Sequence, residues 1–209
     1  MIYLIGGSPR CGKTILAKKI ASSKKLSWIT TDAIRPIILN SLPKTQIKSR
    51  FPQSTMKTPS NKFRFDIYSH KAINDAQWIE AKTMWPGTKA LISHLVGREQ
   101  DYVIEGIHLL PKFINELKNT DYWKSIRAVY LVKKDLNRII EDFPKNKNEY
   151  DWMLPAIIGD ISRLKKAAKM VQTKSDYLCK EAKKYNLKVF NTDANFEQKL
   201  RDAQNYLLQ

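Results

Sequence analysis

Residues 7–14 read Gly-Ser-Pro-Arg-Cys-Gly-Lys-Thr and match the pattern G-x-x-x-x-G-K-[ST] in full. An apolar run at residues 2–5 precedes this segment, and a helical stripe that starts at Ile15 follows it. In that setting the glycines let the backbone turn so that successive N–H groups converge on one point. The start of the following helix adds the positive end of its dipole. The segment therefore predicts a phosphate-binding loop between a buried strand and a helix.

Within this loop Lys13 is predicted to neutralise the β- and γ-phosphates of a nucleotide, and the Thr14 hydroxyl to ligate Mg²⁺. We interpret Cys11 as a small side chain that fills space, in preference to a redox switch. The residues expected to contact the nucleotide are Gly7, Ser8, Arg10, Cys11, Gly12, Lys13, Thr14 and Ile15.

Short apolar runs alternate with helical patterns along the rest of the chain. Further strands are expected at residues 26–30, 102–104, 128–132 and 187–190, and helices at 33–40, 67–85, 161–185 and 196–207. Pro86-Gly87 is expected to end one helix, and Leu91 lies in the next. This alternation predicts an α/β fold: a parallel sheet with helices on both faces.

Two carboxylates follow predicted strands. Glu105 closes the strand at 102–104, where a second metal-binding group belongs, although it could be a surface carboxylate at a strand end. Asp32 ends the strand at 26–30 and is expected to face the same crevice as the loop, because ligands bind beyond the carboxyl ends of parallel strands. There Asp32 could accept the proton of an attacking hydroxyl, or it could cap the next helix, and the two roles are compatible.

Three groups are candidates for contacts with the phosphoryl acceptor or the transferred phosphoryl group. Arg35, one turn after Asp32, could bind an anionic group of the acceptor or be a surface charge. His108 follows Glu105 at the active edge and is a candidate substrate contact. Residues 134–160 could form a lid, for which Arg138 and Arg163 are the best candidates for catalytic cations, while most lysines there belong to a solvated face.

The 209 residues carry 37 Lys and Arg against 20 Asp and Glu, a net charge of +17 that favours phosphorylated or polyanionic partners. We expect one domain over residues 1–209, with a basic insertion or substrate region at about 41–99. Its first part, 41–64, holds six basic and no acidic side chains and is interpreted as a mobile insertion without a packed element. It is either a solvated loop or an anion-attracting flap over a substrate site. The two cysteines fit a reducing, cytoplasmic compartment, and we expect neither a signal peptide nor a membrane partner.

The loop at 7–14, Thr31-Asp32-Ala33-Ile34-Arg35 and Val103-Ile104-Glu105-Gly106-Ile107-His108 together resemble the P-loop kinase superfamily. The segments look most like the 2-phosphoglycerate kinase type, and more distantly like zeta toxins, chloramphenicol phosphotransferases and polynucleotide kinases. The resemblance implies a sheet of order 2-3-1-4-5, ATP and Mg²⁺ as cofactors, and Asp32 as the base. It also implies that the turn containing Asn191 and Thr192 lies near the adenine. The acceptor cannot be carried over, because residues 41–99 match no known pattern.

Three function classes follow from these features. The first is an ATP-dependent phosphotransferase that moves the γ-phosphate to a hydroxyl of a small, anionic molecule. The second is a 5′-hydroxyl polynucleotide kinase, for which the net charge and basic insertion argue. The third, a regulatory nucleotide-binding switch protein, is disfavoured because no aspartate has glycine three residues later, as the D-x-x-G turn of that class requires.

Overall fold

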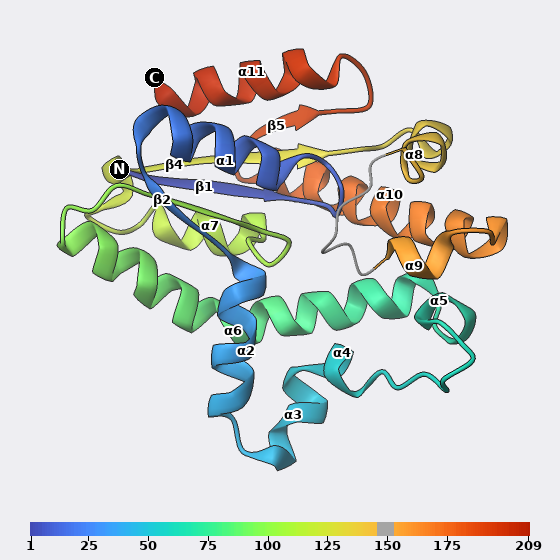
Figure 1. Cartoon of the computed structure of the whole chain (residues 1–209). Coiled ribbons are helices and arrows are strands. Elements are labelled where there is room, and N and C mark those ends of the chain that lie inside the picture. Colours follow the sequence, from blue (N-terminus) through green and yellow to red (C-terminus); the bar gives the residue numbers. More distant parts are fainter. Residues whose placement is uncertain (146–152) are drawn as a thin grey trace.

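The computed structural model describes residues 1–145 and 153–209, and in this part of the chain five parallel strands form one sheet of order β2-β3-β1-β4-β5. This confirms the predicted strands and their order. Strands β2 and β3 lie on one side of β1, and strands β4 and β5 lie on the other. The loop after β1 and the carboxyl ends of β2 and β3 therefore lie at one edge of the sheet (Figure 1). The strands are β1 (Ile2–Gly7), β2 (Ser27–Thr30), β3 (Tyr102–Gly106), β4 (Ile126–Val132) and β5 (Lys188–Asn191).

Central strand β1 is buried along its whole length and pairs with both β3 and β4. Gly7, its last residue, has φ +153°, and a Cβ atom there would lie 2.2 Å from the carbonyl oxygen of Leu131 on β4. Only glycine fits this close approach between two backbones. Gly7 therefore allows β1 and β4 to pack closely at the point where the chain leaves the sheet and enters the phosphate-binding loop.

Helices cover both faces of the sheet, as the α/β prediction requires (Figure 1). On one face α1 and α11 pack against side chains such as Ile5 and Leu131, and on the other α6, α7 and α10 pack against side chains such as Leu4 and Tyr130. Two apolar layers thus hold the central strands in place, which fixes the positions of their carboxyl ends. These helices are α1 (Lys13–Lys24), α6 (His70–Gly97), α7 (Pro111–Leu117), α10 (Ile161–Lys184) and α11 (Phe196–Leu208).

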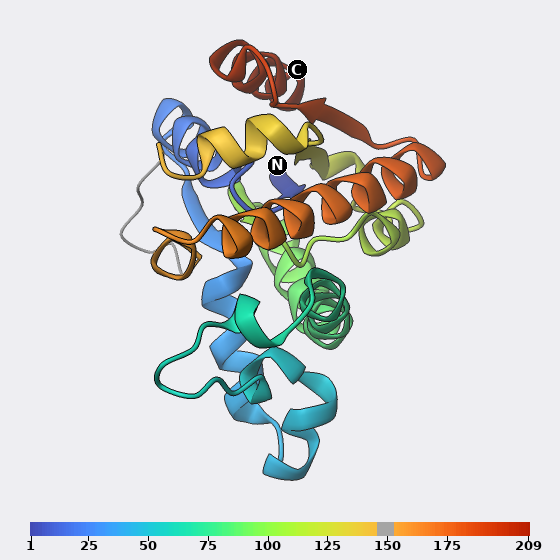
Figure 2. The same ribbon diagram turned by 90° about the vertical axis from the view of Figure 1, so that its right-hand side faces the viewer.

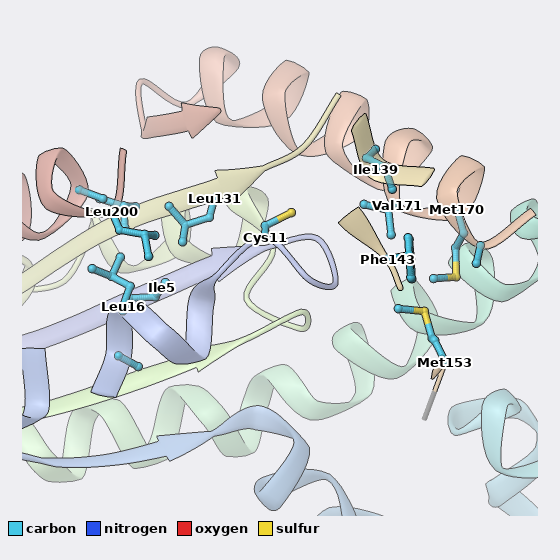
Figure 3. Packing of buried hydrophobic residues seen from close by; sticks show 14 of the residues in the cluster. Ile5, Cys11, Leu16, Leu131, Ile139, Phe143, Met153, Met170, Val171 and Leu200 are labelled. Carbon is cyan, nitrogen blue, oxygen red and sulfur yellow. The ribbon is translucent and has the colours of Figure 1, made fainter. Parts of the chain in front are cut away.

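The first apolar layer continues past the end of the sheet. Figure 3 shows Leu16 and Leu200 near the strands and, farther along, Phe143 and Met153 next to Val171 of α10. These residues connect the helices after β4 to the core: α8 (Leu136–Asp142) and α9 (Leu154–Ile157). Residues 146–152 of the expected lid lie outside the described part of the chain. No helix in the described ranges is long and apolar enough to cross a membrane.

The basic insertion contains short packed helices, so the expectation of no packed element at 41–64 is wrong. After α2 (Thr31–Ser41), the chain forms α3 (Lys44–Arg50), α4 (Pro52–Thr55) and α5 (Arg64–Ile67), which lie beside α6 (Figure 2). Phe51 is fully buried against Met84 of α6 and Ile34 of α2. A single aromatic anchor holds a short, polar segment in place, which hydrophobic periodicity could not reveal.

Replacing Phe51 with alanine is expected to lower the free energy of unfolding by about 3–5 kcal/mol, because it leaves a cavity where an aromatic ring was fully buried. The matched control is Phe63→Ala in the same insertion, where the ring is 38% exposed and the loss should be about 1 kcal/mol or less. Chemical denaturation of both variants measures the difference. Equal losses would show that Phe51 does not anchor the insertion.

Helix α6 runs unbroken from His70 to Gly97, so the expected break at Pro86-Gly87 is wrong. Proline removes one N–H donor from the ladder, but burial of the same apolar face on both sides of Pro86 compensates for it. Ala81 and Trp85 before the proline and Ile92 and Leu95 after it all pack in the second apolar layer. The helix starts at His70, with the Ser69 side chain as its cap, rather than at Ile67.

Candidate active site

The loop after β1 has the geometry that the sequence predicts. Gly12 adopts a left-handed conformation with φ +94°, and α1 begins at the next residue, Lys13. A Cβ atom on Gly12 would lie 2.8 Å from the ring of Phe196, so glycine is required for conformation and for space. Lys13 is buried and its Nζ donates to the Ser8 carbonyl oxygen at 2.8 Å, which holds the ammonium over the loop.

The side chains of the loop are bound to its surroundings. Ser8 Oγ lies 2.7 Å from both Cys11 Sγ and Ser175 Oγ, and Ser175 Oγ accepts from the backbone N–H of Lys133 at 3.1 Å. Burial raises the pKa of the Cys11 thiol, which keeps it protonated and fits a filler side chain. Ser8 thus ties the loop to α10 and, through Ser175, to Lys133 just after β4.

Arg10 has φ +60°, and its guanidinium donates to the carbonyl oxygen of Phe143 at 2.6 Å and lies 4.6 Å from the ring centroid of Phe143. Its side chain therefore binds the segment after α8. The nucleotide contacts predicted for residues 7–15 remain a prediction. Because the Arg10 side chain binds Phe143, we expect the contact of Arg10 to be made by its backbone N–H. Ile15 is 45% exposed on α1, so its side chain does not face the buried side of the loop.

Thr14 and Glu105 are brought together, as predicted for a metal site. Thr14 Oγ1 donates to Glu105 Oε1 at 2.8 Å, and Glu105 is almost fully buried at the end of β3. Burial raises the pKa of Glu105, and the nearby Lys13 ammonium and the Thr14 hydroxyl oppose that rise. A hydroxyl and a carboxylate are hard oxygen ligands, so these residues fit the Mg²⁺ ion that the loop implies.

Asp32 lies at the adjacent strand end, on the first turn of α2. The expectation that Asp32 caps this helix is wrong: Thr30 is the cap, and its Oγ1 accepts from the Asp32 backbone N–H at 3.3 Å. The Asp32 carboxylate is therefore not used for capping. It is 67% exposed, and one of its oxygens lies 3.8 Å from His108 Nδ1.

His108 is almost fully buried and connects the ends of β2 and β3. Its Nδ1 lies 2.9 Å from Thr31 Oγ1, and its Nε2 is buried without a hydrogen-bond partner among the described residues. Burial lowers the pKa of His108 well below its usual value, and the cations Lys174, Arg35 and Lys13 lower it further. The imidazole is therefore neutral at pH 7 and has one ring nitrogen open to a ligand hydroxyl.

Arg35 binds a buried carboxylate on α6. Its guanidinium donates to both oxygens of Glu80, at 2.7 and 3.1 Å, and to Ser54 Oγ at 2.7 Å. Glu80 is fully buried and also accepts from the backbone N–H of Gln53 at 2.8 Å. Arg35 is therefore neither a free surface charge nor a free anion-binding group, because it ties α2 to α4 and α6. Its predicted contact with substrate remains a prediction.

Sequence reasoning missed Lys174. This residue lies on α10 and is fully buried, and its Nζ donates to Gln77 Oε1 on α6 at 2.6 Å. Burial lowers the pKa of Lys174 to about 7; Lys13 contributes to the decrease, and Asp32 and Glu80 oppose it. The available signal was a lysine next to Ser175 on the apolar stripe of a long helix.

Lys174→Met is expected to change how stability depends on pH. Above pH 7 the folded protein has released the Lys174 proton, while the unfolded chain holds it up to about pH 10.5, so the wild type gains stability as pH rises through this window. Relative to Lys174→Met, its free energy of unfolding should rise by up to about 1.4 kcal/mol per pH unit. Urea unfolding at about pH 6.5 and about pH 9.5 measures this difference. Lys180→Met, an exposed change on the same helix, should show no such trend.

The two candidate lid arginines are bound to their own neighbours. Arg138 donates to the Asp193 carbonyl oxygen at 3.0 Å and lies 3.7 Å from Asp135. Arg163 pairs with Asp66 of α5 at 2.6 Å and with Asp160 at 3.3 Å. The two arginines thus bind different partners, and their catalytic role remains a prediction.

The turn after β5 lies beside the phosphate-binding loop. Thr192 is buried, and its Oγ1 donates to the carbonyl oxygens of Cys11 and Val132, at 3.3 and 3.2 Å. Asn191 is exposed and its Oδ1 accepts from the backbone N–H of Asp193. This position is compatible with the predicted contact with adenine, which remains a prediction.

No protein-family model and no curated protein matches this chain. Solved structures do match over almost its whole length. A shikimate kinase from Bacteroides thetaiotaomicron has a TM-score of 0.54 and 15% identity, covering 100% of this chain and 99% of that one. A gluconokinase from Sinorhizobium meliloti 1021 has a TM-score of 0.55 and 12% identity, covering 99% and 90%. A sugar kinase from Janibacter sp. HTCC2649 has a TM-score of 0.54 and 14% identity, covering 99% and 93%.

At these identities the likeness concerns the fold. It agrees with the sheet order and with the loop between β1 and α1. The particular resemblance to the 2-phosphoglycerate kinase type remains a prediction. The chain therefore has the five-stranded parallel sheet, covered by helices on both faces, of the P-loop kinases.

Proposed function

We propose that this protein is an ATP-dependent phosphotransferase that moves the γ-phosphate of ATP to a hydroxyl of a small, anionic molecule. One observation carries the proposal: the Thr14–Glu105 pair lies between the loop that holds Lys13 and the strand end that holds Asp32. A phosphate site, a metal site and a carboxylate base thus share one edge of the sheet. The names of the similar structures, which include shikimate kinase and gluconokinase, support the same class.

The buried charges beside Asp32 support an anionic acceptor. Lys174 is electrostatically coupled to Asp32 and to Glu80, and Arg35 binds Glu80 directly. Burial lowers the pKa of Lys174 to about 7, and an acceptor that carries a carboxylate or phosphate would stabilise its protonated form. We propose Lys174 as the residue that recognises this anionic group.

In this proposal Lys13 binds the β- and γ-phosphates, and the amides of residues 7–13 orient them. Asp32 accepts the proton of the acceptor hydroxyl, and His108 orients the acceptor through its open Nε2. Thr14 and Glu105 hold Mg²⁺, which when bound neutralises charge on the phosphate oxygens. The structure adds nothing in favour of a polynucleotide acceptor. The unpartnered polar atom beside Asp32, His108 Nε2, is buried, whereas a polynucleotide binds along an exposed surface.

A phosphate-transfer screen tests the proposal. Hydroxylated carboxylates, sugar phosphates, nucleosides and 5′-hydroxyl oligonucleotides are offered with radiolabelled ATP or GTP, and labelled product is measured. We expect transfer from ATP to one of the first two groups. Transfer only to oligonucleotides, or absence of magnesium-nucleotide binding in calorimetry, would contradict the proposal.

Glu105→Gln is expected to raise the Mg²⁺ concentration that gives half-maximal rate by about tenfold or more, because an amide oxygen binds the cation more weakly than a carboxylate. Glutamine still accepts from Thr14, so the fold should be unchanged. The control is Glu99→Gln, an exposed change near the start of β3. The same Mg²⁺ dependence in all three proteins would remove Glu105 from the metal site.

A further inference from the structure

A second candidate site lies away from the phosphate-binding loop. A groove of about 400 Å³ runs between α6, α7 and α10, and its volume is within the range of small-molecule sites. Neither the loop at 7–14 nor Asp32, Glu105 or Lys174 contributes to it. Its walls are aromatic and its rim is basic, with side chains that include Trp78, Trp85, Phe113, Tyr177, Lys82 and Lys112.

The two tryptophans of this groove differ in one respect. Trp85 stacks on Phe113 with ring centroids 5.3 Å apart, and its Nε1 donates to Glu116 at 2.7 Å. The ring centroids of Trp78 and Tyr177 lie 4.9 Å apart. The Trp78 Nε1 atom is buried and has no hydrogen-bond partner in the ranges that the structure describes. A buried N–H without an acceptor costs about 1–3 kcal/mol. An acceptor atom on a ligand would recover that free energy.

The rim of the groove is positively charged. Lys82 of α6 and Lys112 of α7 are exposed, and neither has an ion pair or hydrogen bond within residues 1–145 and 153–209. Glu116 is the acidic residue of the lining, and it is already bound to Trp85. The rim therefore attracts anions, whereas the aromatic walls favour a planar apolar body.

We propose that this groove binds a small aromatic anion, a planar ring that carries a carboxylate or phosphate. The ring packs against Trp78 and Tyr177, an acceptor atom takes the Trp78 indole N–H, and the negative group lies between Lys82 and Lys112. Because the groove shares no residue with the proposed active site, its ligand is neither the nucleotide nor the acceptor. The inference therefore stands independently of the proposed function.

Titration with 2-naphthoate tests this site, with neutral 2-naphthamide as the matched ligand. The full chain is first saturated with a non-hydrolysable ATP analogue and Mg²⁺, so that the nucleotide loop is blocked. Calorimetry should give a saturable site for the naphthoate and at least about fivefold weaker binding of the amide. In ¹H–¹⁵N spectra the Trp78 indole signal, assigned from Trp78→Phe, should move downfield as its N–H gains an acceptor.

Two variants and a control complete the test. Trp78→Phe keeps a smaller aromatic ring but removes the N–H, and Lys82→Met with Lys112→Met removes the charge; each should weaken naphthoate binding about fivefold or more. Trp123→Phe, outside the groove, should leave it unchanged. Unaltered spectra of the other indoles show that each variant is folded. Binding that the ATP analogue abolishes, that Trp78→Phe leaves unchanged, or that the amide equals would overturn the proposal.

Discussion

Lys13→Ala is expected to reduce phosphoryl transfer by about 10³-fold or more. The ammonium of Lys13 is buried at the loop, 2.8 Å from the Ser8 carbonyl oxygen, so it is already oriented before a nucleotide binds. In the transition state negative charge builds up on the transferred group, and removal of this cation leaves that charge uncompensated. Steady-state rates with the acceptor found in the screen measure the loss.

The control for this substitution is Lys24→Ala, which removes an exposed lysine at the other end of α1. Its rate should equal that of the wild type, so a general effect of net charge is separated from the effect of the loop. Thermal unfolding of Lys13→Ala shows whether the fold survives. A folded Lys13→Ala protein with the rate of the wild type would contradict the role of the loop in transfer.

The phosphate-binding loop, the sheet order and the Thr14–Glu105 pair could be predicted from the sequence because local signals specify them. A glycine-lysine motif between an apolar strand and a helix leaves little freedom, and parallel strands bring their carboxyl ends to one edge. The cap of α2 could not be assigned correctly, because Thr30, Thr31 and Asp32 are all capping residues and only the backbone conformation distinguishes them.

The buried part of the acceptor region could not be predicted, because it forms between elements that are distant in sequence. Lys174 meets Gln77 across the packed faces of α10 and α6, and Arg35 meets Glu80 across α2 and α6. Each of these residues taken alone is typical of a solvated helix face. Only the packing of three helices removes them from water, and this burial lowers the pKa of Lys174.

These contacts also connect the acceptor region to the phosphate-binding loop. Ser175 follows Lys174, and its Oγ lies 2.7 Å from Ser8 Oγ of the loop. One turn of α10 therefore contacts both the phosphate-binding loop and the proposed acceptor region. The neutral His108 imidazole lies within 3.8 Å of the Asp32 carboxylate and within 2.9 Å of Thr31. The proposed base, the buried Lys174 and the proposed phosphate cradle are thereby held on rigid elements at fixed separations, which favours a single reactive geometry.

Asp32→Asn should lower kcat by about 10²- to 10⁴-fold while leaving the KM for ATP almost unchanged. The carboxylate does not cap α2, because Thr30 does, so the amide should cost the helix only the favourable interaction of a first-turn carboxylate with the helix dipole, about 0.3–1 kcal/mol. Asparagine has the same size but cannot take the proton of an attacking hydroxyl. The loss therefore concerns the transition state more than binding of the ground state, which is the expected signature of a general base.

A control variant distinguishes this role from a purely structural one. Thr30→Ala removes the cap instead and should lower the free energy of unfolding by about 1 kcal/mol. If Asp32→Asn kept the wild-type kcat, the proton would have to leave by another route, and the neutral His108, whose Nε2 lacks a partner among the described residues, would be the next group to test.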